Sequence, residues 1–145
     1  MPDEVEVVGR LFAAVENRDL AGLLACYSDD VEINEANSLP WGGVWRSRSG
    51  AVAHAEAFAR VWGVLQEPET CSMDPHFWDD GSGTVCALFR NRAVDPASGD
   101  RFDAPEVGIY RVRAGRVVHS QMFHADSGAV LAFLRGIHSE SEDLP

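Results

Sequence analysis

YSDDVEINEANSLPWGGVW, residues 27–45, is the stretch that decides how the rest of the chain is interpreted. It begins as a strand, because the apolar residues Val31 and Ile33 alternate with polar ones. The same alternation places Glu35 on the apolar face, where an unpaired carboxylate is costly. Two interpretations stay open: the strand ends early and leaves Glu35 in water, or Glu35 faces a pocket. The stretch closes in a loop, residues 38–47, whose proline and glycines accompany two tryptophans.

The composition limits the classes of partner. The chain of 145 residues carries a formal net charge of −11 and has no basic run, so we expect neither nucleic acid nor an anionic membrane as a partner. The first residues are acidic, unlike a signal peptide, and no window is apolar for long enough to span a bilayer. We therefore expect a cytoplasmic protein with one domain, residues 1–138, followed by an acidic flexible tail, residues 139–145.

The reactive side chains exclude several chemistries. The three cysteines, Cys26, Cys71 and Cys86, form no C-x-x-C pair, and no histidines cluster at ligand spacing, so neither a disulfide framework nor a metal site is predicted. All twelve basic residues are arginine, which removes every mechanism that requires a Schiff-base lysine. The chain also lacks a G-x-G-x-x-G nucleotide loop. We expect activity without a metal or an organic cofactor.

Helical spacing of apolar residues dominates the first half of the chain, and strands separated by turn sequences follow. The expected helices begin at N-cap residues with side-chain oxygens, namely Asp3, Asp19, Ser49 and, after the strands, Asp126. The first three helices are expected over 4–17, 20–26 and 50–66. The strands are expected as an antiparallel meander at 69–78, 84–94, 101–112 and 116–124. This order indicates an α+β domain, in which a curved antiparallel sheet wraps around the N-terminal helices as a cone with a hydrophobic pocket.

Two segments carry a resemblance to a known superfamily. They are AAVENRDLAGLLACYSDDVEINE at 13–35 and PEVGIYRVRAGRVV at 105–118. With the order of elements over nearly the whole chain, they make the sequence similar to the nuclear transport factor 2-like superfamily. Within it, the chain resembles the SnoaL-like polyketide cyclases, the ketosteroid isomerases and the limonene epoxide hydrolases. The resemblance implies the cone and indicates which strand faces look into its pocket.

Compared with the catalytic residues of ketosteroid isomerases and epoxide hydrolases, the sequence matches at one position and differs at several others. Glu35 falls where ketosteroid isomerases keep their general-base aspartate and where epoxide hydrolases keep an asparagine that positions water. The isomerase oxyanion hole requires a tyrosine and an aspartic acid, but this chain has Leu11 and Gly108 at those places. The arginine and aspartates of the epoxide hydrolases are also missing, since their places are taken by Phe89, Asn91 and Met122. Neither set of accessory residues is therefore expected.

The resemblance, together with strand alternation, gives the candidate site. Four polar residues are candidates for acid–base catalysis: Glu35, Glu106, His124 and Asn91. Eight more are expected to line the substrate pocket or its rim: Trp41, Trp45, Phe58, Trp62, Phe89, Tyr110, Ser120 and Met122. A mostly apolar cavity with a few convergent polar groups is typical of a small-molecule site. Desolvated carboxylates there should have raised pKa values, which suits proton exchange with a neighbouring histidine.

Each polar candidate also has a structural alternative. Glu106 could pair with Arg90 or Arg101 on the outer face, His124 could cap the last helix, and Asn91 could satisfy backbone groups. His76 and His119 are left out of the candidate site, because their strand register is open or points them away from the pocket.

The resemblance implies a cofactor-independent SnoaL-like enzyme that cyclises or isomerises a hydrophobic, polyketide-derived molecule, as in antibiotic biosynthesis. Two alternatives stay open: an epoxide hydrolase or epoxide-opening cyclase with Glu35 as base, and a non-catalytic small-molecule-binding or dimerisation module. A homodimer is also expected, because the outer sheet face exposes apolar and arginine side chains, namely Val107, Ile109, Arg111, Val118 and Phe123.

Overall fold

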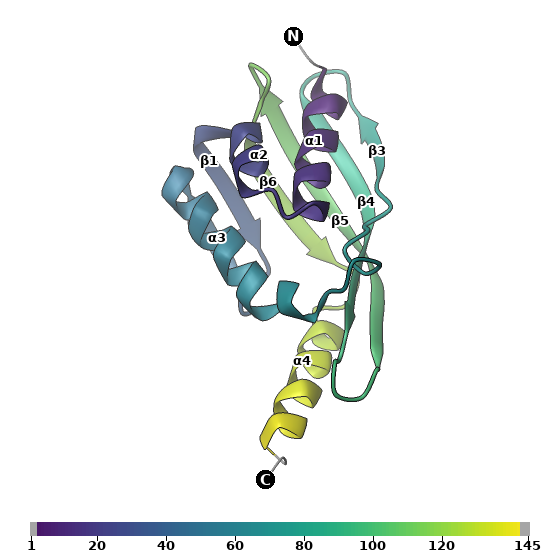
Figure 1. Cartoon of the computed structure of the whole chain (residues 1–145). Helices are drawn as coiled ribbons and strands as arrows, with labels where there is room; N and C mark the ends of the chain where they lie inside the picture. The colour runs from purple at the N-terminus through teal and green to yellow at the C-terminus, as the bar shows by residue number, and fades with distance from the viewer. Residues whose placement is uncertain (1–2, 143–145) are drawn as a thin grey trace.

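The computed structural model describes residues 3–142 of the chain, with side chains through residue 137. It contains four α-helices and six strands (Figure 1). The helices are α1 (Glu4–Glu16), α2 (Leu20–Cys26), α3 (Ser47–Val61) and α4 (Ser127–Glu142), and a short 3-10 turn spans Gly63–Leu65. The strands are β1 (Tyr27–Glu35), β2 (Gly43–Arg46), β3 (His76–Asp79), β4 (Thr84–Val94), β5 (Arg101–Arg113) and β6 (Arg116–His124).

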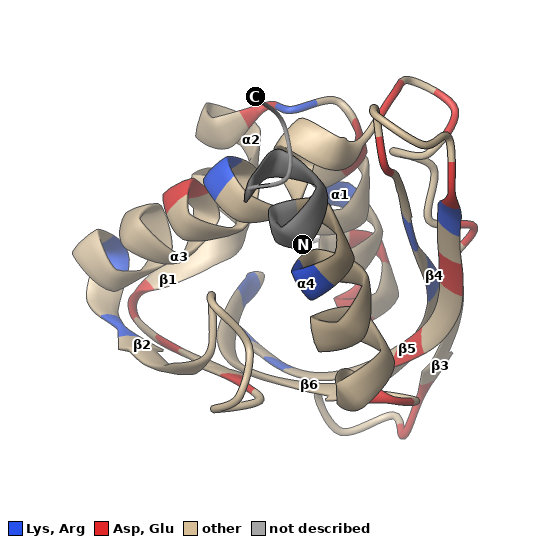
Figure 2. Cartoon of the chain, turned by 90° about the horizontal axis from the view of Figure 1, so that it is seen from below, with Lys and Arg blue, Asp and Glu red and all other residues tan. Residues whose placement is uncertain are grey.

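The strands form one sheet in the order β2-β1-β6-β5-β4-β3. Neighbours β3 to β6 make the predicted antiparallel meander, whereas β1 pairs with β6 in parallel, so the whole sheet is mixed rather than purely antiparallel. Figures 1 and 2 show α1, α2 and α3 on the concave face of the curved sheet. The α+β cone is confirmed, and its sheet does not close into a barrel.

Side-chain caps begin three of the helices where the sequence predicts them. Asp3 accepts a hydrogen bond from the backbone N–H of Glu6 at the start of α1, and Asp19 accepts one from Gly22 at the start of α2. Asp126 accepts from the N–H of Ala129 at the start of α4. Each bond satisfies one of the orphan donors of a first helical turn.

Helix α3 differs from its prediction at both ends. It begins at Ser47, and its N-cap residue Arg46 makes no side-chain cap bond, so the predicted cap at Ser49 is wrong. The hydroxyl of Ser49 instead lies 3.0 Å from that of Ser47. The helix ends at Val61, because the chain tightens into the 3-10 turn that follows.

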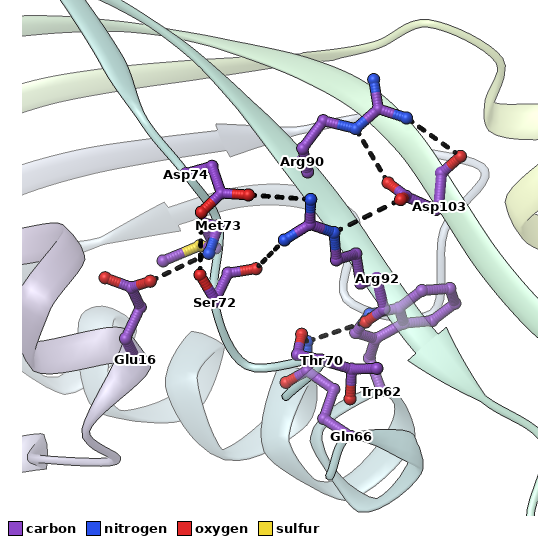
Figure 3. Close-up of polar contacts among 10 residues, drawn as sticks. All are labelled: Glu16, Trp62, Gln66, Thr70, Ser72, Met73, Asp74, Arg90, Arg92 and Asp103. Atoms are coloured by element: carbon purple, nitrogen blue, oxygen red, sulfur yellow. Dashed lines mark hydrogen bonds and ion pairs between the residues drawn. The ribbon is translucent and has the colours of Figure 1, made fainter. Parts of the chain in front are cut away.

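Segment 69–75 is not part of a strand, because its polar groups are satisfied by other elements. Thr70 closes a turn by accepting a hydrogen bond from the N–H of Glu67. The N–H of Met73 donates to the carboxylate of Glu16 on α1 (Figure 3). Strand pairing therefore starts only at His76.

The last helix runs into the segment predicted as a tail. Residues 139–142, predicted as part of the tail, continue α4, which extends to Glu142. Residues 143–145 of that predicted tail lie outside the described residues. None of the helices in the described part combines the length and hydropathy that a membrane crossing requires.

Two clusters of buried side chains make the core. The first lies between α1 and the sheet and includes Val8, Phe12 and Val31. The second joins the 38–42 loop, the end of α3 and helix α4, and includes Trp41, Trp62 and Leu134. Each fully buried large apolar side chain contributes roughly 1.5–3 kcal/mol to folding. The second cluster thereby fixes α4 against the end of the cone at which β1 and β6 finish.

Candidate active site

The strand register brings three of the predicted polar residues to one end of the concave face. Glu106 on β5 lies opposite His124 on β6 and opposite Phe89 on β4. Glu35 is the last residue of β1, the strand that pairs with β6 on its other side. Because side chains alternate across a strand, all three point toward the helices. The strand does not end before Glu35, so the pocket-facing interpretation is the one that the structure supports.

His124 lies between the two carboxylates. Its Nδ1 is 3.3 Å from Oε1 of Glu106, and its Nε2 is 3.9 Å from Oε1 of Glu35. The three side chains are almost fully buried, with exposed fractions of 6% for Glu35, 10% for Glu106 and 4% for His124. Each carboxylate therefore faces a different nitrogen of one buried imidazole.

A fourth group, His54, belongs to this cluster and was not predicted. It projects from α3, and its Nε2 lies 2.7 Å from Oε2 of Glu35. Its side chain is 16% exposed, so it is the member of the cluster nearest to water. His54 precedes Phe58 by one helical turn, and that i, i+4 spacing could have placed it on the pocket face.

A cavity of about 290 Å³ opens beside these groups. Eight predicted residues line it: Glu35, Phe58, Phe89, Asn91, Glu106, Tyr110, Ser120 and Met122. Apolar side chains from α1 and α2, including Leu11, Phe12 and Leu23, complete its wall. Most of the lining is apolar, with a smaller number of polar side chains that include Glu35 and Glu106, as in sites that hold a hydrophobic small molecule.

The tryptophans occupy other positions than predicted. Trp41 and Trp62 are 1% and 0% exposed and belong to the second core cluster, so they do not line the cavity. Trp45 packs its ring near that of His54 and donates its indole N–H to the carbonyl of Trp41. The large apolar area of these rings favours burial in the core. Trp41 still contributes indirectly, because its ring lies behind that of His124.

The structural alternatives for the polar candidates find no support. Arg90 pairs with Asp103 at 2.8 Å rather than with Glu106, and Arg92 contacts Asp103 and Asp74 (Figure 3). Asp126, and not His124, caps α4. Asn91 is buried, and its Nδ2 donates to no described residue.

Four buried side-chain atoms lack a hydrogen-bond partner within the described part of the chain. They are Glu35 Oε1, Asn91 Nδ2, Ser120 Oγ and His124 Nε2. A buried polar atom without a partner costs about 1–3 kcal/mol, so such atoms are commonly matched by a ligand or water. The unused atoms Glu35 Oε1 and His124 Nε2 lie 3.9 Å apart; Glu35 lines the cavity, whereas His124 lies behind its wall.

Burial separates the protonation states of the cluster. It raises the pKa of Glu106 well above its ordinary value, and the negative charge of Glu35 raises it further. Burial also lowers the pKa of His124, against the opposing effect of Glu35. Glu106 therefore keeps its proton to a higher pH than an ordinary glutamate does, and His124 stays neutral to a lower pH than an ordinary histidine does.

The same three groups could offer donor atoms to a small cation. One atom each from Glu35, Glu106 and His124 lies within 4.8 Å of the others. However, His124 turns opposite nitrogens toward the two carboxylates, which suits the sharing of protons along the row better than convergence on one ion. Activity without a metal stays a prediction.

Comparison with known proteins gives a family and a fold. Residues 8–120 match the model of the SnoaL-like domain. Uncharacterized proteins of Mycobacterium tuberculosis (Rv0034) and Mycobacterium bovis (Mb0035) are each 30% identical over 134 residues, covering 90% of this chain and 95% of theirs.

The similar solved structures share the fold at low sequence identity. TerC, co-crystallised with polyporic acid, has a TM-score of 0.77 at 18% identity and covers 91% of this chain and 98% of its own. An NTF2-like protein of Burkholderia pseudomallei has a TM-score of 0.76 at 20% identity, covering 92% and 98%. A protein of Pseudomonas putida, provisionally named a polyketide cyclase, has a TM-score of 0.70 at 16% identity, covering 90% and 98%.

Proposed function

The chain belongs to the SnoaL-like domain family, and from that premise we propose that it is a cofactor-independent enzyme that uses carboxylate and histidine acid–base chemistry. Its substrate is a hydrophobic, polyketide-derived small molecule, and its reaction is a cyclisation or an isomerisation. The names of neighbours such as the Pseudomonas putida protein support the polyketide assignment. A ligand-bound relative, TerC with polyporic acid, supports a small-molecule site in this fold.

One observation carries the proposal: His54, Glu35, His124 and Glu106 form a row in which histidines and carboxylates alternate. The successive contacts are 2.7, 3.9 and 3.3 Å. The row leads from the partly exposed His54 to the buried Glu106 along the wall of an apolar cavity. Pairs of titratable groups whose environments separate their pKa values are typical of acid–base sites.

In this mechanism Glu35 is the base and Glu106 is the acid. His54 occupies Oε2 of Glu35 and leaves Oε1 free to remove a proton from carbon beside a substrate carbonyl. Glu106, protonated because burial and Glu35 raise its pKa, donates a hydrogen bond or a proton to the developing enolate oxygen. Neutral His124 between them can pass a proton from one carboxyl to the other, which restores the starting state.

The apolar wall supplies the other part of catalysis. Phe12, Phe89 and Tyr110 pack edge to face, so that side of the cavity is rigid. A rigid wall can hold an extended chain with its reactive ends together, which removes much of the entropic barrier to ring closure.

The test uses 5-nitrobenzisoxazole, a flat aromatic probe that opens when a base removes its ring C–H proton. The N–O bond then breaks, a nitrile forms and the released phenolate absorbs visible light. Because a desolvated carboxylate is a strong base for this step, we expect turnover by the parent protein and a fall of about 10²- to 10⁴-fold for Glu35→Gln. Glu32→Gln is the matched control, since Glu32 lies on the same strand but pairs with Arg46 outside the cavity.

Three results would contradict this proposal in different ways. Similar turnover by the parent and the Glu35→Gln variant would rule out Glu35 as the base. Binding of the probe without turnover would favour a non-catalytic binding module. Loss of turnover on treatment with EDTA, restored by one divalent ion, would replace metal-free chemistry by a metal site.

We also propose that the protein is a homodimer that pairs through the convex face of its sheet. On that face Phe123 lies opposite Val107, and both flank Ile109. Phe123 is 54% exposed, and Trp78, on β3 at the edge of the sheet, is 56% exposed. Exposed aromatic side chains of this size are unusual on a small monomer and are typical of interfaces.

A further inference from the structure

Arg18 is an exposed residue that lines the same cavity as the α3 residue His54. It belongs to the short turn between α1 and α2 and lines the cavity together with Leu20 and Gln66. Its backbone has a φ of 57°, in the left-handed region that non-glycine residues rarely adopt. This conformation is an ordinary way to end a helix: the N–H of Arg18 donates to the carbonyl of Val15, and the N–H of Asp19 donates to that of Ala14.

The guanidinium of Arg18 is held in a fixed place by neutral groups. Its Nη2 donates to the carbonyl of Gly63 at 3.0 Å, to Sγ of Cys71 at 3.2 Å and to Oε1 of Gln66 at 3.4 Å. A Cβ atom at position 63 would lie 2.6 Å from Nη1 of Arg18, so the glycine provides the space for the guanidinium. Its Nε and Nη1 donate to no described residue.

Arg18 has no carboxylate partner within 4.0 Å among the described side chains. The other arginine that lines the cavity, Arg90, is paired with Asp103. Acidic neighbours of Arg18 in the chain are engaged elsewhere: Asp19 caps α2, and Glu16 accepts from the N–H of Met73. Two carboxylates, Asp19 and Glu56, line the same cavity, so Arg18 is distinguished by its free N–H donors rather than by a net positive charge of the surroundings.

The surroundings of Arg18 suit an amphiphile. Leu20, beside it on the rim, is 42% exposed, and Leu23, Phe58 and Phe89 line the cavity beyond it. We propose that Arg18 binds the carboxylate of a hydrophobic acid whose apolar body fills the cavity and whose far end reaches Glu35. A guanidinium with two free donors is well suited to a planar carboxylate. This inference rests on the proposed function only in placing the ligand in the same cavity, and it names the substrate class as a free hydrophobic carboxylic acid.

The experiment compares two probes of the same shape that differ in charge, 4-biphenylcarboxylate and 4-biphenylcarboxamide. Isothermal titration calorimetry at neutral pH should show the carboxylate binding the parent protein about five- to tenfold more tightly than the amide, which is typical of a partly solvated charged hydrogen bond. Arg18→Gln should remove this preference and leave the affinity for the amide nearly unchanged. Retained amide binding also shows that the variant is folded.

Controls separate a local contact from general electrostatics. Arg116→Gln removes the same charge at the exposed β5–β6 turn and should keep the full preference for the acid. Equal affinity of the parent for acid and amide, or an acid weaker than about 1 mM, would overturn the inference. A preference that survives in Arg18→Gln, or one that is lost equally in Arg116→Gln, would overturn it too.

The two proposals fail separately. Glu35→Gln should keep the preference for the carboxylate, since Glu35 contacts His54 and His124 and makes no contact with Arg18. Turnover of the benzisoxazole probe without any preference for the acid would leave the acid–base proposal standing and remove only the role of Arg18.

Discussion

The two oxygens of Glu35 have different surroundings, and the difference comes from one helical residue. His54 contacts Oε2, whereas Oε1 has no partner among the described residues. Because the contact with His54 holds Oε2 in place, the direction in which the free Oε1 points is also fixed. Orientation of a base contributes to catalysis without any change in its chemical nature.

This orientation can be measured with His54→Phe. The variant keeps a ring of similar size and removes the nitrogen that contacts Glu35, so we expect turnover of 5-nitrobenzisoxazole to fall about tenfold with little change in KM. His119→Phe is the control, because His119 contacts Glu32 on the outer face and should leave turnover unchanged. An unaltered rate in His54→Phe would mean that packing alone orients Glu35.

Glu106 should make stability depend on pH with a definite sign. In the unfolded chain it releases its proton near the ordinary value of 4.5, but burial and Glu35 raise its pKa in the folded chain. Above pH 4.5 the folded state therefore holds a proton that the unfolded state has lost, and stability falls as pH rises toward the folded pKa.

Glu106→Gln removes this titration. Urea unfolding at about pH 5 and pH 8 should show that the parent loses stability at the higher pH through Glu106 and the variant does not. The free energy of unfolding of the variant minus that of the parent should therefore be larger at pH 8 than at pH 5. His124 contributes with the opposite sign, since burial lowers its pKa, but it is present in both proteins. A difference between variant and parent that is the same at both pH values would show that Glu106 is not protonated in the fold.

At the residue scale, strand alternation together with the family resemblance predicted part of the site. Glu35, Glu106 and His124 sit where the period of two and the strand register place them. His54 was missed because it lies on a helix, across the cavity from the strand that suggested the site. Trp41 and Trp62 were misplaced because a sequence shows that an aromatic residue is buried but not whether it faces a cavity or a neighbouring helix.

At the scale of elements, the turn residues predicted the bounds of the long strands well. They did not predict which strands distant in the sequence pair with one another. β4, β5 and β6 lie within a residue of their expected ranges, because glycine-containing turns separate them. β2 was predicted as loop, since its four residues become a strand only by pairing with β1. The parallel contact of β1 with β6 joins segments about ninety positions apart, and no local pattern encodes it.

The β5–β6 hairpin offers a test of this turn chemistry. Ala114 and Gly115 both have positive φ, 53° and 75°, as a two-residue type I′ turn requires. Alanine is strained there, whereas asparagine tolerates this backbone, so Ala114→Asn should raise the free energy of unfolding by about 0.5–1 kcal/mol. Ala114→Val should lower it, because a β-branched residue fits this region worst. Urea unfolding measures both, and the opposite order would contradict the assigned turn.

At the scale of the whole molecule, the curved sheet has two faces with different tasks. Its concave face carries the row from His54 to Glu106 and the apolar cavity. Its convex face carries exposed apolar side chains, including Trp78, Leu88 and Phe123. Because a one-residue slip of register would exchange the faces, the register that builds the site also builds the convex surface.

Because the convex face lies on the other side of the sheet from the site, the proposed homodimer can be tested by substitutions that leave the site intact. Light scattering should give a mass near twice the chain mass of 15.8 kDa for the parent protein at micromolar concentration. Phe123→Arg places a charge at the centre of the convex face and should give the single-chain mass, since an unpaired charge in an apolar interface costs several kcal/mol. Val64→Arg is the matched control: Val64 is 69% exposed in the 3-10 turn, away from the sheet, and its variant should stay dimeric. A parent that elutes as a monomer would reject the dimer, and a Phe123→Arg variant that remains dimeric would move the interface off this face.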